Sequence, residues 1–132
     1  MKFAKKIHTI ACDDIREEKN NKFSLMGMYG KEIVFNKLPA LLPKLCIIIM
    51  LEEVREKFAK IEITMKLPKT KPQVFNRQVP PNIGLKSDFN FIFCLSPFKV
   101  EETGEAIFEV RIGESKRTNY VYRLKINERK IS

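Results

Sequence analysis

The sequence contains no tryptophan, one histidine, five glycines and three cysteines in 132 residues. It has no Gly-rich phosphate loop, no Gly-x-Ser-x-Gly elbow and no His-Glu-x-x-His motif, so it lacks the signatures of several large enzyme classes. The longest apolar run, residues 45–51, is too short to span a membrane. We therefore expect a protein without a transmembrane segment, without a cofactor and without catalytic residues.

The cysteines, at positions 12, 46 and 94, are odd in number, and no two of them have the spacing of a metal site. All three fall in apolar segments that we predict to be strands. We expect buried thiols that act as small hydrophobic side chains in a reducing compartment. Spacing alone does not decide whether two of them form a disulfide. Polar residues interrupt the short apolar run after Lys2, Lys5 and Lys6, so we expect no signal peptide and a cytoplasmic location.

Alternating apolar residues are the strongest pattern in the chain. Because strand side chains point to opposite faces in turn, each set lies on one face and needs a second layer to cover it. The pattern predicts an all-β fold, an immunoglobulin-like antiparallel β-sandwich of about seven or eight strands with little helix. We expect a single domain over residues 1–132 with a frayed tail at 127–132. The alternating sets are Ala59, Ile61, Ile63, Met65 and Leu67; Phe89, Phe91, Phe93 and Leu95; Ala106, Phe108, Val110 and Ile112; and Tyr120, Tyr122, Leu124 and Ile126.

The first half of the chain predicts a hairpin and a central strand. Residues 6–13 and 23–29 read as strands joined by a turn at 19–22, where asparagine tolerates positive φ. Gly27, inside the second strand, indicates a bulge or a close backbone approach. Residues 45–51 are apolar at every position and predict a strand buried on both faces. A helix over 45–60 competes with this interpretation, but three successive β-branched isoleucines favour the strand.

The net charge is +9, and the excess is concentrated in part of the chain. Residues 66–86 contain four prolines, and we predict a long basic loop with a short strand at 73–76. Such a loop attracts an acidic partner, although positive charge also serves solubility. We assign partner contacts to this loop and to the hairpin end at 13–22. The candidate contact residues are Lys66, Lys69, Lys71, Phe75, Arg77, Lys86, Asp14 and Arg16.

An acidic cluster, Asp13, Asp14, Glu17 and Glu18, surrounds Arg16. Carboxylates so placed could bind a divalent cation, form an acid/base pair or make a polar hairpin end with Arg16 as ion-pair partner. We favour the polar hairpin end, because no second acidic cluster stands at a suitable spacing, and we assign no metal ligand. A metal-dependent hydrolase built on Asp13, Asp14 and Glu17 is a third functional hypothesis. His8 and Cys12 lie about 13 Å apart along the predicted strand, which excludes a direct catalytic pair.

Two stretches resemble known families. Residues 12–18, Cys-Asp-Asp-Ile-Arg-Glu-Glu, and 21–29, Asn-Lys-Phe-Ser-Leu-Met-Gly-Met-Tyr, resemble the N-terminal signature of an uncharacterised family of small bacterial and phage-associated proteins. The apolar segment 38–45 continues that resemblance, which implies no known activity and hints at a role in phage–host conflict or in a mobile element. Residues 97–110 look like the last hairpin of many immunoglobulin-like sandwiches, which supports the architecture only.

These observations favour a non-enzymatic module that binds another protein, a second copy of itself included. An open sandwich exposes strand edges, and such edges either are blunted by charge or pair with a partner. The alternative is a nucleic-acid-binding domain, in which the basic loop at 66–86 contacts phosphates and Phe75 stacks on a base.

Overall fold

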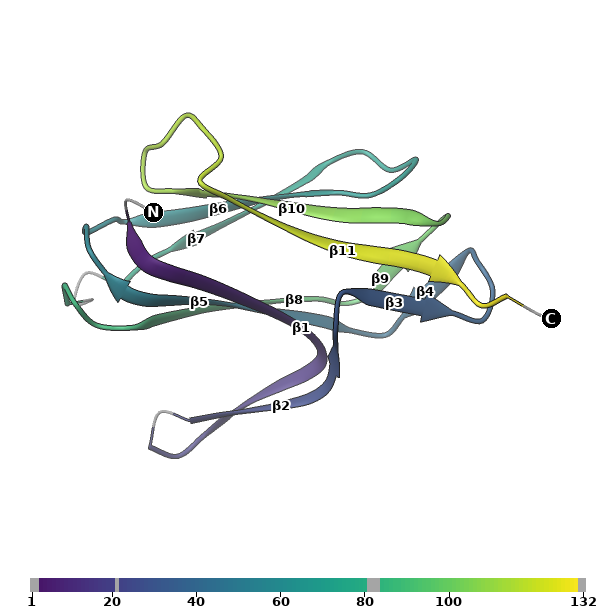
Figure 1. Ribbon diagram of the computed structural model, residues 1–132, viewed down its shortest axis with the longest axis horizontal. Helices are drawn as coiled ribbons and strands as arrows, with labels where there is room; N and C mark the ends of the chain where they lie inside the picture. Colours follow the sequence, from purple (N-terminus) through teal and green to yellow (C-terminus); the bar gives the residue numbers. More distant parts are fainter. Residues whose placement is uncertain (1–2, 21, 81–83, 131–132) are drawn as a thin grey trace.

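The computed structural model describes residues 3–20, 22–80 and 84–130. Within these ranges the chain forms eleven β-strands and no helix, so no helix there could cross a membrane. The strands form two main sheets that lie face to face (Figure 1), with a small two-stranded sheet beside them. The all-β sandwich predicted from alternating apolar residues is confirmed, with more strands than expected because several short segments also pair.

The first sheet has four strands in the order β2-β1-β5-β8. All its neighbours are antiparallel, and β5 lies between β1 and β8. Its side chains from Leu45 to Ile49 are buried, as expected for a strand with apolar residues on both faces. The helical alternative for 45–60 is therefore wrong. The bounds are β1 Ala4–Glu18, β2 Lys22–Tyr29, β5 Leu45–Val54 and β8 Phe89–Leu95.

The second sheet has five strands in the order β3-β11-β10-β6-β7. Its pairs are antiparallel except β3 with β11, which run parallel. The apolar connection at 38–43 forms β4, which pairs with β9 after the break at Pro97. The bounds are β3 Glu32–Phe35, β4 Ala40–Leu42, β6 Lys60–Lys66, β7 Gln73–Gln78, β9 Phe98–Val100, β10 Gly104–Ile112 and β11 Tyr120–Glu128.

The core lies between the two main sheets and consists of the alternating residues. Along β10 every second side chain is buried, and the same holds for Ile61, Ile63 and Met65 on β6. Phe108 on β10 reaches the opposite layer, with its ring centroid 6.1 Å from that of Phe93 on β8. Ring contacts of this kind add to the hydrophobic stabilisation and hold the layers in one relative position.

Three sequence predictions need correction at element boundaries. The polar run at 13–18 belongs to β1, because it pairs with β2. The segment 66–86 is not one long loop: Gln73–Gln78 forms β7, longer than the predicted 73–76, and pairs with Lys60 to Met65 of β6. The prediction that residues 127–132 fray is wrong for Asn127 and Glu128, which pair with β3, while 131–132 lie outside the described residues.

Truncation of a residue that joins the layers should strongly destabilise the fold. We expect Phe108→Ala to lower the free energy of unfolding by about 3–5 kcal/mol, because it removes a fully buried ring and leaves a cavity. Urea denaturation monitored by circular dichroism measures the change. The matched control is Val121→Ala on β11, where the side chain is exposed and the expected loss is below about 1 kcal/mol. Equal losses in the two variants would contradict the assigned core.

Candidate functional site

The predicted contact residues do not form one surface. Asp14 and Arg16 lie on β1 of the first sheet, whereas Lys66 ends β6 and Phe75 and Arg77 lie on β7, the edge of the second sheet. Lys86 lies apart from both groups and lines an open hollow of about 590 Å³ on the first sheet, beside His8, Met50, Glu52 and Asp88. In this hollow His8 Nε2 is 3.5 Å from Glu52 Oε2, and both side chains are half-exposed.

The basic segment at 66–86 is partly neutralised by carboxylates. The Lys66 ammonium is 2.9 Å from Glu109 Oε1, and the Lys69 ammonium is 3.2 Å from Glu102 Oε2. The Phe75 ring stacks on Phe93, with centroids 6.0 Å apart, and packs against the core. Its inward packing conflicts with the predicted role of Phe75 as a stacking platform for a nucleic-acid base.

The distal half of β1 and its partner β2 form a two-stranded arm, which consists of the described residues 13–20 and 22–29 and which we call the arm at 13–29. β1 pairs with β5 only from Ala4 to Cys12, whereas its pairing with β2 continues to Glu18. Figure 1 shows this hairpin extending away from the two layers, at the lower edge of the view. Its side chains include two exposed methionines, Met26 (38% exposed) and Met28 (62%). The arm is thus a largely polar hairpin that exposes two apolar side chains and has little cover from the rest of the described chain.

The root of the arm depends on Gly27. This residue has φ +66° and lies where the β1/β2 register places it opposite Asp13. A Cβ at position 27 would overlap the Asp13 carboxylate. The close approach predicted for Gly27 is therefore confirmed. It lets Asp13 lie across β2 and accept a hydrogen bond from the Tyr29 hydroxyl.

The phenol of Tyr29 has a perturbed pKa. Burial raises the pKa of Tyr29, and the hydrogen bond to the Asp13 carboxylate adds to the effect, giving a pKa of about 12 in place of 10. Both causes favour the neutral phenol over the phenolate. Stability gained from this residue is therefore present below pH 10 and is lost as the pH rises from 10 toward 12.

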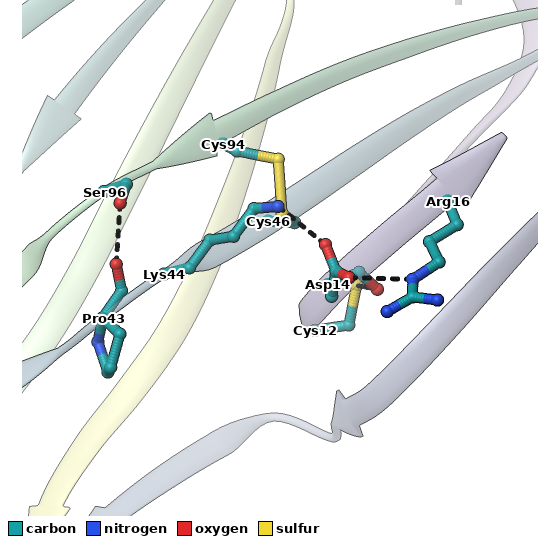
Figure 2. The surroundings of a disulfide bond; sticks show 8 residues. All are labelled: Cys12, Asp14, Arg16, Pro43, Lys44, Cys46, Cys94 and Ser96. Atoms are coloured by element: carbon teal, nitrogen blue, oxygen red, sulfur yellow. Dashed lines mark hydrogen bonds and ion pairs between the residues drawn. A yellow bond between two sulfur atoms is a disulfide. The ribbon is translucent and has the colours of Figure 1, made fainter.

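An ion pair connects the arm to the start of β5. The Lys44 ammonium donates to Asp14 Oδ1 at 2.7 Å, and Arg16 Nε lies 3.4 Å from Asp14 Oδ2. Figure 2 shows both cations directed at this carboxylate. The hydrogen bond from Lys44 is the main cause that lowers the pKa of Asp14. The predicted pairing of Arg16 with a neighbouring carboxylate is confirmed, and Lys44 is a partner that sequence spacing did not reveal.

Three of the four carboxylates of the acidic cluster are engaged in polar contacts. Asp13 accepts from Tyr29, Asp14 binds two cations, and Glu18 accepts a hydrogen bond from Ser24 at 3.0 Å. Among residues 3–20, 22–80 and 84–130, no group of three His, Cys, Asp or Glu side chains could hold a metal ion. The arrangement is that of a polar hairpin held by ion pairs and hydrogen bonds.

The three cysteines lie side by side on neighbouring strands of the first sheet. Cys12 is opposite Cys46, and Cys46 is opposite Cys94, to which it is joined by a disulfide. Cys12 and Cys46 are fully buried, but Cys94 is exposed on the edge strand β8. The prediction of three buried thiols is therefore correct for Cys12 alone: Cys46 is buried but disulfide-bonded, and Cys94 is both disulfide-bonded and exposed. Sequence spacing could not find this row, because it arises from the register of three strands.

A comparison with protein families finds one family whose model covers most of this chain. The model of one family, a family of unknown function (DUF6941), matches residues 8–125. The chain belongs to that family. The expectation of an uncharacterised family is thus confirmed. No curated protein matches the sequence. The matched range includes the arm and all three cysteines, so both lie within the family's domain.

The described chain also has an apolar hollow that sequence reasoning did not find. It has a volume of about 340 Å³ at one end of the sandwich and is lined mainly by Val54, Phe58, Ala59, Val79 and Pro80. Phe58 also makes edge-to-face ring contacts with Phe3 and Phe89. The next residues along the chain, 81–83, lie outside the described ranges, so the hollow supports no site assignment.

Substitution of Gly27 should destabilise the arm. Gly27→Ala places a Cβ against the Asp13 carboxylate and forces a non-glycine residue to positive φ, at a cost of about 1–3 kcal/mol. We expect faster hydrogen exchange of the amides at 13–29, measured by mass spectrometry. Gly30→Ala is the matched control, because no atom of the described residues beyond the chain neighbours lies within 4 Å of a Cβ there, and it should leave the exchange unchanged. Unchanged exchange in Gly27→Ala would contradict the proposed packing.

The hydrogen bond from Tyr29 should be visible in a tyrosine titration. We expect Asp13→Asn to lower the pKa of Tyr29 from about 12, but to a value still above 10, because burial is the larger cause and remains. Ultraviolet titration of tyrosinate formation measures this shift, and Tyr29→Phe identifies the transition. A Tyr29 pKa that is the same in the wild type and in Asp13→Asn would show that the contact is not formed in solution.

Proposed function

We propose that this protein is a non-enzymatic protein-binding module and that the arm at 13–29 is its contact surface, with a second copy of the chain as partner. The observation that carries the proposal is the extension of the arm beyond the sandwich with Met26 and Met28 exposed. An isolated two-stranded hairpin is only marginally stable in water, so an arm of this kind gains from a third strand or from a covering surface.

The free edge of β2 supports pairing through the backbone. β2 has one charged residue, Lys22, at its first position and no proline, whereas exposed edges are usually blunted by charge or proline. The other edge strands of the two main sheets are less suited to pairing. β3 has only four residues, and β7 carries Arg77. β8 has no charged residue, but it exposes no large apolar side chain. Among the edges of the described sheets, β2 is therefore the best suited to strand addition.

Charge supports a second copy as the occupant. The chain as a whole has a net charge of +9, but the arm contains four acidic residues against three basic ones. Two positively charged sandwiches repel each other. The repulsion is weakest if the two chains meet through their arms, because the arm carries no positive excess. Pairing of β2 with β2 about a two-fold axis would keep the basic bodies apart and join the arms, in the isologous arrangement most common for dimers.

The nucleic-acid alternative receives less support from the described contacts. Lys66 and Lys69 are paired with carboxylates, and the Phe75 ring packs inward. Arg77 is exposed on β7 and separated from Lys86, which lines a different surface. Binding of single strands normally needs several aromatic rings along a continuous basic groove.

We further propose that the protein acts in the bacterial cytoplasm, in a phage-related or mobile-element system. The resemblance of residues 12–29 to phage-associated bacterial proteins supports this setting. In a reducing compartment a disulfide such as Cys46–Cys94 is usually transient or redox-sensing, so the location also implies that the bridge is reversible.

The oligomeric state tests the proposal. We expect sedimentation equilibrium to show a species of twice the 15.5 kDa chain mass. Met28→Lys adds a charge to the arm and should shift the equilibrium to monomer, by at least about tenfold in the dissociation constant. Val74→Lys, which adds the same charge at an exposed valine of the β7 edge (54% exposed), is the matched control and should remain dimeric.

Two results would overturn the proposal. A wild-type chain that stays monomeric at all concentrations would remove the second copy as partner, and dissociation by Val74→Lys instead of Met28→Lys would remove the arm as interface. Steeply salt-dependent binding of mixed single-stranded oligonucleotides, weakened by Arg77→Ala and not by Met28→Lys, would favour the nucleic-acid function instead.

A further inference from the structure

The row formed by Cys12, Cys46 and Cys94 places a free thiol beside a disulfide. Residues directly opposite in an antiparallel pair point to the same face of the sheet, so all three side chains lie on one face, with Cys46 in the middle. Figure 2 shows the bridge between Cys46 and Cys94, with Cys12 on the adjacent strand. The central sulfur thus has one cysteine on each side.

Cys94 is bonded to Cys46, and the register places Cys12 close to the range of a disulfide with the same residue. Opposite residues of antiparallel strands have Cβ atoms about 4.5–5.5 Å apart, and a disulfide joins Cβ atoms about 3.5–4.5 Å apart. A small approach of β1 and β5 would therefore allow Cys12 and Cys46 to bond. The entering and leaving sulfurs lie on opposite sides of Cys46, which is the arrangement that displacement at sulfur requires.

We propose that this row is a thiol–disulfide exchange site that transfers the free thiol from buried Cys12 to exposed Cys94. Cys12 loses its proton to solvent, and its thiolate attacks the sulfur of Cys46. The Cys46–Cys94 bond breaks as the Cys12–Cys46 bond forms, and Cys94 leaves as a thiolate that takes up a proton from solvent. One disulfide and one thiol are present before and after, so the step needs no oxidant or reductant.

The two disulfide isomers differ in the accessibility of their free thiol. In the first the thiol is buried and inaccessible, whereas in the second it lies on the free edge of β8. There it can be modified by a low-molecular-weight disulfide, which forms a mixed disulfide at Cys94 and releases one equivalent of the small thiol. This exchange among the three sulfurs does not depend on what the arm binds.

The surroundings of Cys12 slow the exchange at neutral pH. Burial is the largest effect and raises the pKa of the Cys12 thiol, and the Asp13 and Asp14 carboxylates raise it further, whereas the hydrogen bond with the Asp14 backbone and the Lys44 ammonium oppose them. The phenol of Tyr29 on β2 also faces this region and is neutral over the same pH range. The thiolate is the attacking species, so below the thiol pKa the rate should rise about tenfold for each pH unit.

Differential alkylation tests the proposal on the full-length, oxidised chain. N-ethylmaleimide is added to the native protein at pH 6, 7.5 and 9, and a heavy isotopic form is added after denaturation in acid. Trypsin cleavage after Lys6, Arg16, Lys44, Arg55, Lys86 and Lys99 puts each cysteine in a separate peptide. We expect the light reagent on Cys94 together with a Cys12–Cys46 linked pair, formed faster at higher pH.

Two variants serve as controls. Cys12→Ser keeps the Cys46–Cys94 bridge but removes the attacking thiol, so it should abolish labelling of Cys94. Cys94→Ser leaves Cys12 and Cys46, which should form a disulfide under mild oxidation if their approach is as close as the register implies.

The same measurements can overturn the inference. Light label on Cys12 with the Cys46–Cys94 bridge intact would show opening of the sheet without exchange. Heavy label confined to Cys12 after hours at pH 9, or two free thiols in oxidised Cys94→Ser, would show that the sulfurs do not meet.

Discussion

The pairing of β5 with both of its neighbours is the constraint on which the rest of the structure depends. Its register with β1 and β8 turns Ile47 and Ile49 toward the second sheet, together with Phe91 and Phe93. The same register places the three cysteines in one row on the other face. A slip of one residue would turn the core side chains outward and separate the sulfurs, so packing and sulfur chemistry share one determinant.

The arm follows from the point where this pairing stops. Beyond Cys12, β1 pairs with no described strand on the β5 side, and its backbone continues with β2 alone. Side-chain contacts hold the arm at this boundary, where β5 no longer pairs with β1. Lys44 binds Asp14, and Gly27 admits the Asp13 carboxylate that accepts from Tyr29. Polar contacts therefore anchor the root of the arm, while its methionines remain exposed. A hairpin that is anchored at its root and uncovered along its length can present a strand edge from a small sandwich.

Much of the fold could be predicted because period-two patterns report directly on strands and on their buried faces. Phe108, Val110, Ile61 and Ile63 are buried as their alternation indicated. Prediction from the sequence was weaker for segments whose side chains are polar or flanked by proline but whose backbone nevertheless pairs as a strand. Asp13 to Glu18 are polar yet extend β1, because β2 supplies the backbone partners, and Gln73–Gln78 pairs with β6 despite flanking prolines. The candidate contact residues were dispersed for the same reason, since adjacency in sequence does not place two strands of different sheets on one surface.

Local patterns in the chain by themselves determined its all-β class, the main core-facing residues, the β1/β2 hairpin and the special role of Gly27, because each depends on residues close together in sequence. The tertiary structure alone decided which strands became neighbours. That choice paired Lys44 with Asp14, turned the Phe75 ring inward and brought Cys12, Cys46 and Cys94 into one row. The physical reason is that register between distant strands is set by the packing of the whole core, to which no short segment contributes enough information on its own.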